Sequence, residues 1–190
     1  MLKYSICKIS PLIRKLFTQI ESSSVFPTAW KSSFLVPLHK KGSKGNPDNY
    51  RGLAVGSNLG KFFTKCLNDR LTSYAEKLNL ISENQFGFRP DFRTSDAIFT
   101  LKTLVNHQKI KNNQPLYAVF VDFSKAFDSV NRETLSYKLG TFGIRGSLLK
   151  LFVNMYDTND YIVKANNEFS FPIQTSVGLK QGCCLSPLTF

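Results

Sequence analysis

One short stretch limits the fold and chemistry of this chain more than any other: an uncharged run that ends in a carboxylate. Residues 116–121 carry no charge and follow the turn-prone residues 112–115, which predicts a strand buried on both faces. Asp122 closes the run. An ionised Asp there loses roughly several kcal/mol of hydration unless a cation or a set of donors replaces the water. Asp122 is therefore a candidate metal ligand, and the alternative is that it caps the following turn.

The composition favours a folded protein with a polyanionic partner. With 42% hydrophobic and 13% aromatic residues, the 190-residue chain can bury a core as one domain or as two incomplete ones. Its formal charge of +12 favours nucleic acid or an anionic membrane surface. Residues 1–60 hold nine Lys or Arg against two Asp or Glu, whereas residues 116–190 hold seven against six. The basic field thus belongs to the N-terminal part.

The cysteine spacing and the hydropathy predict an intracellular protein, in the cytoplasm or nucleus. The four cysteines show no C-x-x-C spacing and lie far from the two histidines, so neither a zinc site nor a disulfide framework is indicated and reduced thiols are expected. No apolar run approaches the roughly 20 residues of a membrane span. Residues 1–25 are expected to form an amphipathic helix that starts at Pro11, followed by a linker. The alternative for this segment is a basic transit peptide.

The pattern of residues 34–55 predicts a β-hairpin with a basic tip. Strands are expected over 34–38 and 50–55, around a turn rich in Gly, Asn and Pro, and Pro37 should limit the first strand to a sheet edge. Basic side chains gather at this tip. Because Arg makes bidentate contacts to phosphate and Lys adds movable charge, such a fork suits a triphosphate. The alternative is a solvated basic loop. The cations are Lys40, Lys41, Lys44 and Arg51.

Residues 81–96 mix aromatic, arginine and turn-forming residues between two helical patterns. The helices are expected over 59–78 and 95–110, the second with Leu101 and Leu104 facing inward. Aromatic and Arg side chains together suit stacking on bases and bonding to phosphate. This segment is therefore a candidate nucleic-acid contact.

The C-terminal third alternates helices with a hairpin. Helices are expected over 131–139 and 148–156, a hairpin over 161–174, and a new helix at Ser186, which is followed by Pro187. The helix beginning there is only a few residues long. Since so short a helix is not stable alone, the chain is expected to be cut short within an element.

Four of these segments, taken in order, resemble one family. Val-Asp-Phe-Ser-Lys-Ala-Phe-Asp-Ser-Val at 121–130 resembles motif A of reverse transcriptases, in the form typical of non-LTR retrotransposons and group II intron maturases. The hairpin resembles the family's fingers hairpin, and Gln-x-Gly-Phe-Arg at 85–89 resembles its template-strand segment. Leu-x-Gln-Gly-x-x-x-Ser-Pro at 179–187 is similar to motif B. The resemblance covers about residues 26–190.

The resemblance implies how a nucleotide and a metal are held. Asp122 would hold catalytic Mg²⁺, with Mn²⁺ as the alternative ion, and Phe127 would crowd the sugar 2′ position and reject ribonucleotides. Arg51, with Lys40 or Lys41, would grip the phosphates of the incoming dNTP.

It also implies contacts to the base, the sugar and the template. Gln181 and Gly182 would line the nucleotide pocket. Gln85, Phe88 and Arg89 would lie along the template strand.

The implied fold is α+β, a right-hand polymerase fold with fingers and an incomplete palm. Fingers are expected over 26–115 and a partial palm over 116–190, with motif A at 116–130 and motif B at 178–190. The implied function is that of a fragment of an RNA-directed DNA polymerase that extends a DNA primer on an RNA template. No membrane contact is expected, and the oligomeric state is left open.

The family's Asp-Asp motif does not occur in the chain. Because two-metal transfer needs more carboxylates than Asp122 alone, these 190 residues by themselves are expected to be inactive. Two other functions remain open, a non-catalytic nucleic-acid-binding module and a small-molecule phosphotransferase.

Overall fold

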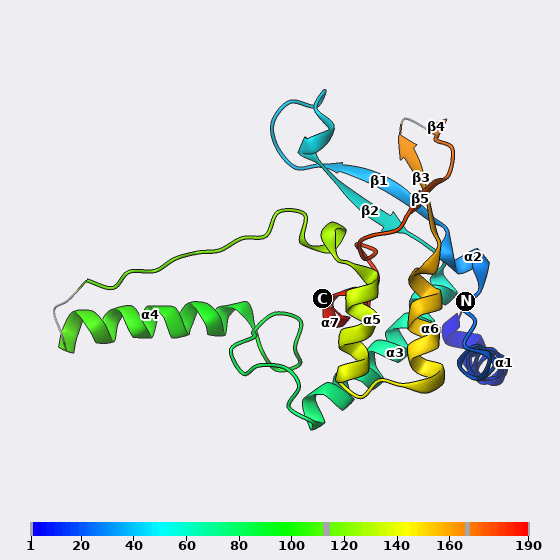
Figure 1. Ribbon diagram of the computed structural model, residues 1–190, viewed down its shortest axis with the longest axis horizontal. Coiled ribbons are helices and arrows are strands. Elements are labelled where there is room, and N and C mark those ends of the chain that lie inside the picture. The colour runs from blue at the N-terminus through cyan, green and yellow to red at the C-terminus, as the bar shows by residue number, and fades with distance from the viewer. Residues whose placement is uncertain (1, 112–114, 166–167, 190) are drawn as a thin grey trace. The chain divides into compact units, whose positions relative to one another are not determined.

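The computed structural model describes residues 2–111, 115–165 and 168–189, and it is a mixed α+β structure (Figure 1). The chain divides into two compact units, one formed by residues 1–68 with 126–190 and the other by residues 69–125. The predicted turn at 112–115 falls largely outside the described residues.

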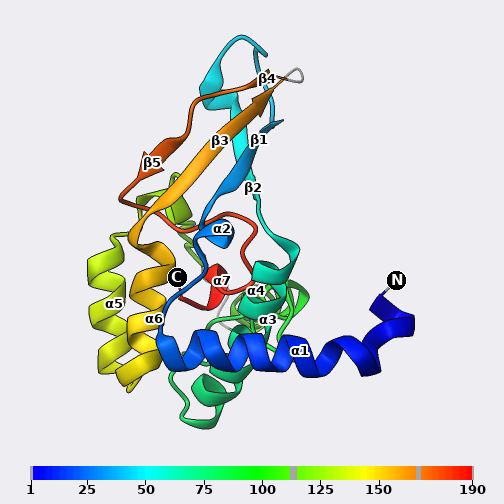
Figure 2. The same ribbon diagram turned by 90° about the vertical axis from the view of Figure 1, so that its right-hand side faces the viewer.

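A five-stranded mixed sheet organises the first unit. Its order is β2-β1-β3-β4, and β5 also pairs with β3. β1 and β2 form the predicted antiparallel hairpin, whereas β3 lies parallel to β1 (Figure 2). The sheet therefore joins the segment expected to form the fingers with part of the segment expected to form the palm. The strands are β1 Ser33–His39, β2 Tyr50–Val55, β3 Asn159–Ala165, β4 Glu168–Phe169 and β5 Ile173–Thr175.

The prediction that Pro37 makes β1 an edge strand is wrong, although Pro37 itself lies in a part of β1 that pairs with one neighbour. β1 has β2 on one side and β3 on the other, so it is an inner strand. The ladder to β3 covers only residues 33–35 of β1 and ends before Pro37. The proline, which has no N–H to donate, thus lies where β1 pairs with β2 alone.

Helices make up most of the rest of this unit and lie beyond one end of the sheet (Figure 2). The prediction that α1 starts at Pro11 is wrong, because the helix begins at Leu2 and runs through the proline. Asn131 caps α5, with its side chain accepting a hydrogen bond from Thr134 N at 2.9 Å. The helices of this unit are α1 Leu2–Ser23, α2 Thr28–Lys31, the first part of α3 Asn58–Lys77, α5 Arg132–Thr141, α6 Gly146–Asp157 and α7 Ser186–Thr189, with 3-10 turns η1 Pro47–Asn49 and η2 Ala126–Ser129.

Two apolar clusters hold the first unit together. Phe17, Phe26, Trp30 and Phe63 stack edge-on or tilted, with ring centroids 5.0 to 6.5 Å apart, and join α1, α2 and α3. Such aromatic pairs add stability beyond the area that they bury. In the second cluster, α5 and α6 pack side by side and bury leucines, Phe152 and Met155.

The second unit holds the end of α3, α4 Thr94–Lys111 and the segment that contains Asp122. The inward packing expected of α4 is wrong. None of its residues is buried, and Leu104 is 57% exposed. Its sequence has the helical period, but the described residues give its apolar side chains no partner surface.

The predicted buried strand at 116–121 is also wrong. The segment is not in a strand, and Tyr117 and Phe120 are 87% and 84% exposed. A strand is stable only when a neighbour takes up its backbone hydrogen bonds. No strand in the described part of the chain pairs with these residues. Residues 116–121 therefore have the composition of a strand but not the neighbouring strand that would stabilise one.

No helix in the described ranges is both long and apolar enough to cross a membrane.

Candidate functional site

Gln181 is held from two sides in the first unit. Ala54 N in β2 donates a hydrogen bond to Gln181 O at 3.0 Å, and Gln181 Nε2 donates to Asp128 Oδ1 at 2.8 Å. Gly182 follows with φ +105°, and a Cβ there would lie 3.1 Å from Ala54 O. Residues 181 and 182 therefore run along the free edge of β2, as close as glycine permits.

The segment before Gln181 is fixed to η2. Gly178 N donates to Val130 O and Leu179 N donates to Phe127 O, both at 2.8 Å. Gly178 has φ +85°, and a Cβ on it would lie 2.8 Å from Asp128 O. The structure thus fixes the backbone of Phe127 beside the segment that leads to Gln181 and Gly182, and these two residues lie beside β2.

A surface pocket of about 320 Å³ opens beside this junction. Its walls are mostly apolar, with polar groups from Asp128, Tyr161, Thr175 and Gln181, which is the usual make-up of a small-molecule site. The lining residues are Leu35, Gly52, Ala54, Asp128, Tyr161, Ile173, Thr175, Val177, Gly178, Leu179 and Gln181.

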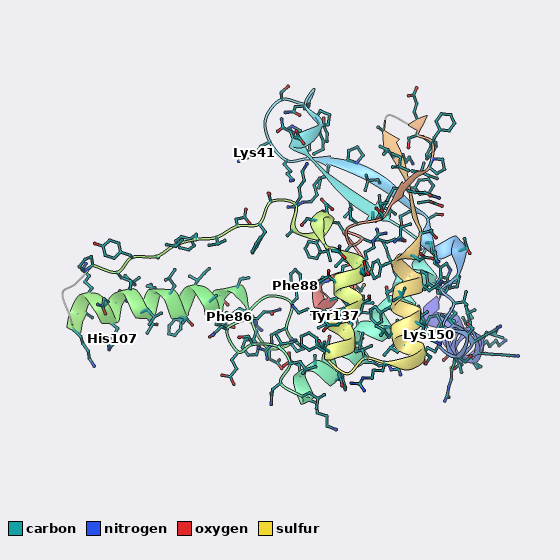
Figure 3. All side chains as sticks on the ribbon, in the orientation of Figure 1. Lys41, Phe86, Phe88, His107, Tyr137 and Lys150 are labelled. Atoms are coloured by element: carbon teal, nitrogen blue, oxygen red, sulfur yellow. The ribbon has the colours of Figure 1, made fainter. Side chains whose placement is uncertain are left out.

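The basic hairpin lies in the same unit. Lys40, Lys41 and Lys44 are exposed in the loop after β1, and Figure 3 shows Lys41 projecting from it. Arg51 is exposed on β2. Because side chains alternate along a strand, Arg51 lies on the opposite face of β2 from Gly52 and Ala54, which line the pocket. The free edge of β2, beside Gln181, borders both faces.

Arg132 is a residue that the sequence reasoning missed. Its guanidinium donates to the carbonyl oxygens of Gly178, Tyr156, Thr175 and Val177 and to Thr175 Oγ1. Burial lowers the pKa of Arg132. The sequence around Arg132 gave no signal of this role, because the carbonyl oxygens that it binds lie more than 20 residues away along the chain. Arg132 fixes the approach of the chain to Gln181.

Lys180 was missed as well. Its ammonium donates to the carbonyl oxygen of Lys31, at the end of α2, with Trp30 O at 3.5 Å. Burial lowers the pKa of Lys180 to about 8. Lys180 and Gln181 are neighbours in sequence, and each binds a different element.

Asp122 lies in the second unit, whereas Arg51 and Gln181 lie in the first. Asp122 is exposed. Among the described residues, no group of three or more His, Cys, Asp or Glu side chains could hold a metal ion. The donor set of the described chain therefore does not complete a Mg²⁺ or Mn²⁺ site, and Asp122 contributes one carboxylate of the kind that those ions prefer.

Arg89 is committed to neighbouring groups in the second unit. It forms a two-point ion pair with Glu76, at 2.9 and 2.7 Å, and donates to Ser82 O at 2.8 Å. Its guanidinium also lies 4.1 Å from the centre of the Phe92 ring. The hydrogen bond between them lowers the pKa of Glu76 and raises that of Arg89. These contacts fix the loop between α3 and α4.

The Phe88 side chain, by contrast, is exposed to solvent. It is 71% exposed, and its φ of +59° is uncommon for a bulky residue (Figure 3). Gln85 is exposed too, with its side-chain amide donating to Gly87 O at 3.3 Å.

Comparison with known proteins agrees with the motifs. The family described as reverse transcriptase (RNA-dependent DNA polymerase) matches residues 38–190. The chain is 26% identical to a probable RNA-directed DNA polymerase from transposon BS of Drosophila melanogaster, over 92% of this chain and 19% of the relative. It is also 26% identical to the RNA-directed DNA polymerase from the mobile element jockey of the same species, with the same coverage.

A third relative is the retrovirus-related Pol polyprotein from the type-1 retrotransposable element R2 of Popillia japonica. It is 26% identical over 86% of this chain and 22% of the relative. The chain thus spans about a fifth of the length of the curated relatives that it matches. On the family match and these relatives, the chain belongs to the reverse transcriptase family and is related to the RNA-directed DNA polymerases of non-LTR retrotransposons.

Proposed function

We propose that this chain is the nucleotide- and template-binding part of an RNA-directed DNA polymerase with a right-hand fold, with fingers over 26–115 and an incomplete palm over 116–190. One observation carries the proposal. Gln181 is bonded to β2 through Ala54 and to η2 through Asp128, so three segments far apart in sequence meet at one place. They belong to the fingers hairpin, motif A and motif B of the resemblance.

The incoming dNTP binds at the free edge of β2. Gln181 and Gly182 contact its base and sugar, and Phe127, fixed beside them through its carbonyl, limits the space at the 2′ position. Arg51, with Lys40 or Lys41, reaches the phosphates. Within the described residues none of these basic side chains forms an ion pair, which supports their availability for phosphate.

The template strand contacts the loop between α3 and α4. Phe88 and Gln85 are exposed there and supply the contacts, and stacking of a base on Phe88 tolerates any sequence. Arg89 acts indirectly, because its hydrogen bonds to Glu76 and Ser82 hold the loop in the conformation that displays Phe88.

Asp122 is the carboxylate that this chain supplies to a divalent metal, Mg²⁺ or Mn²⁺. When bound, such ions stabilise the attacking and leaving oxygens of nucleotidyl transfer. Since Asp122 is not part of a larger cluster of ligands in the described residues, we expect a polypeptide of these 190 residues alone to bind nucleotide and RNA without extending a primer.

Purified chain tests this proposal through fluorescence anisotropy with labelled single-stranded RNA and with a fluorescent dNTP. Arg51→Ala and the double variant Lys40→Ala/Lys41→Ala should weaken nucleotide binding and lower its salt dependence. The matched control is Lys150→Ala, because Lys150 is an exposed lysine on α6 (Figure 3). This variant should bind the nucleotide as tightly as the original chain does. Equal binding by all four proteins would contradict the proposed phosphate contacts.

Primer extension separates the catalytic from the binding claim. With Mg²⁺, an RNA template and a DNA primer, the 190-residue chain should add no nucleotides. Template-directed incorporation that is abolished in Asp122→Ala would show that the chain is active by itself. RNA binding should survive that substitution.

A further inference from the structure

We propose that Asp128 is a positioning residue that sets the direction of the Gln181 side-chain amide at the nucleotide site. The inference rests on the proposed function and deepens it. Its basis is the hydrogen bond of 2.8 Å from Gln181 Nε2 to Asp128 Oδ1.

The direction follows from the chemistry of the two groups. An ionised carboxylate only accepts hydrogen bonds, whereas an amide has a donor end and an acceptor end. The Nε2 end must therefore face Asp128, because a flipped amide would put two oxygen atoms against each other. Gln181 Oε1 is thereby directed away from the carboxylate, and the site offers an acceptor to a donor group of the nucleotide.

The backbone holds Asp128 at this distance. Residues on both sides of it, Phe127 and Val130, accept hydrogen bonds from the segment that leads to Gln181. Gly178 approaches so closely that a Cβ would lie 2.8 Å from Asp128 O and 3.1 Å from its Cα. The Gln181 main chain is itself bonded to Ala54. Because the backbones of Asp128 and Gln181 are both held, the hydrogen bond between their side chains determines the direction of the Gln181 amide.

Within the described part of the chain, the hydrogen bond to Gln181 is not in competition with an ion pair of Asp128. Its side chain is exposed, and in the described ranges it forms no ion pair with a Lys or Arg. Substitution at an exposed site away from the core changes stability little. The effect of removing the carboxylate can therefore be measured on a folded chain.

Three substitutions isolate the hydrogen bond. Asp128→Leu keeps about the same size and removes every acceptor. Asp128→Asn removes the charge and keeps an oxygen that can accept from Gln181 Nε2. Asp157→Leu makes the same chemical change at an exposed position at the end of α6. Circular dichroism melts should show all three folded like the original chain.

The first readout is the NMR spectrum of the Gln181 side-chain amide, assigned by its loss in Gln181→Leu. The two amide protons should move toward free-glutamine positions in Asp128→Leu, and should stay near their original positions in Asp128→Asn and Asp157→Leu. An unchanged Gln181 amide signal in Asp128→Leu would overturn the inference. This readout requires no nucleotide.

The second readout is the affinity for a fluorescent dNTP. Asp128→Leu should bind about three- to tenfold more weakly, the factor that one hydrogen bond represents, and Asp128→Asn should bind within about twofold of the original chain. Unchanged affinity in Asp128→Leu would show that positioning by Asp128 does not matter for the nucleotide. If the original chain binds no dNTP, the proposed function fails, and the NMR result still decides whether Asp128 directs the amide.

Discussion

Arg132 Nε lies 2.9 Å from the carbonyl oxygen of Gly178, and the same guanidinium donates to Tyr156 O at the end of α6 at 2.8 Å. One side chain at the start of α5 therefore joins α6 to the segment that precedes Gln181. Four carbonyl oxygens accept hydrogen bonds from this one guanidinium. A substitution that removes the guanidinium therefore leaves these oxygens without their donors.

Replacing Arg132 should destabilise the first unit. Arg132→Met leaves partly buried carbonyls without donors and should lower the free energy of unfolding by about 2–4 kcal/mol. Arg132→Lys keeps the charge but not the planar fork, so it should recover only part of the loss. Urea denaturation measures both, with Arg145→Met, at an exposed arginine before α6, as the control. Equal stability of the two methionine variants would refute the role of Arg132.

Gly178 should tolerate no side chain. Its φ is +85°, and a Cβ at this position would lie 2.8 Å from Asp128 O, so Gly178→Ala combines backbone strain with a clash against main chain. We expect a loss of about 1–3 kcal/mol in the free energy of unfolding, with weaker dNTP binding. Gly45→Ala is the control, since a Cβ there would meet only Ser43 Oγ at 3.8 Å. A melt of Gly178→Ala that matches that of Gly45→Ala would contradict this geometry.

Lys180 should make stability depend on pH. Because burial lowers its pKa in the fold from 10.5 to about 8, the unfolded chain binds more protons between these values, and the stability contributed by this group rises as pH increases through that window. From pH 7.5 to 10, the original chain should gain about 2 kcal/mol relative to Lys180→Met. Denaturation of both proteins at the two pH values measures this. A constant difference between them would show that Lys180 is not desolvated.

Substitutions at Phe88 and Arg89 should have different effects, the first on RNA binding and the second on the stability of the loop. Phe88→Ala removes an exposed ring and should weaken single-stranded RNA binding by about 1–3 kcal/mol, with an unchanged melting temperature. Arg89→Ala removes the contacts with Glu76 and Phe92 and should lower the protease resistance of the loop between α3 and α4.

Phe99→Ala, at an exposed ring on α4, controls for the loss of an aromatic surface. If it weakens RNA binding as much as Phe88→Ala does, the contact is not specific to the loop.

The sequence was most reliable where a signal is local. The hairpin, α3, α5 and α6 lie within a few residues of their predicted bounds, because helical period, turn residues and the Asn131 cap act over one or two turns. It failed at 116–121, where apolar residues predicted a buried strand and the described chain supplies no partner strand. At Arg89, the presence of an arginine gave no sign that Glu76 accepts hydrogen bonds from its guanidinium.

Four motifs in a fixed order were enough to indicate the family, and with it the expected roles of Asp122, Arg51 and Gln181. The folded structure was needed to see that Ala54 and Asp128 hold Gln181 and that Arg132 and Lys180 fix the chain around it. The difference arises because motif letters record which chemical groups are present. Which donor meets which acceptor is set by backbone hydrogen bonds and close glycine contacts between segments that lie tens of residues apart.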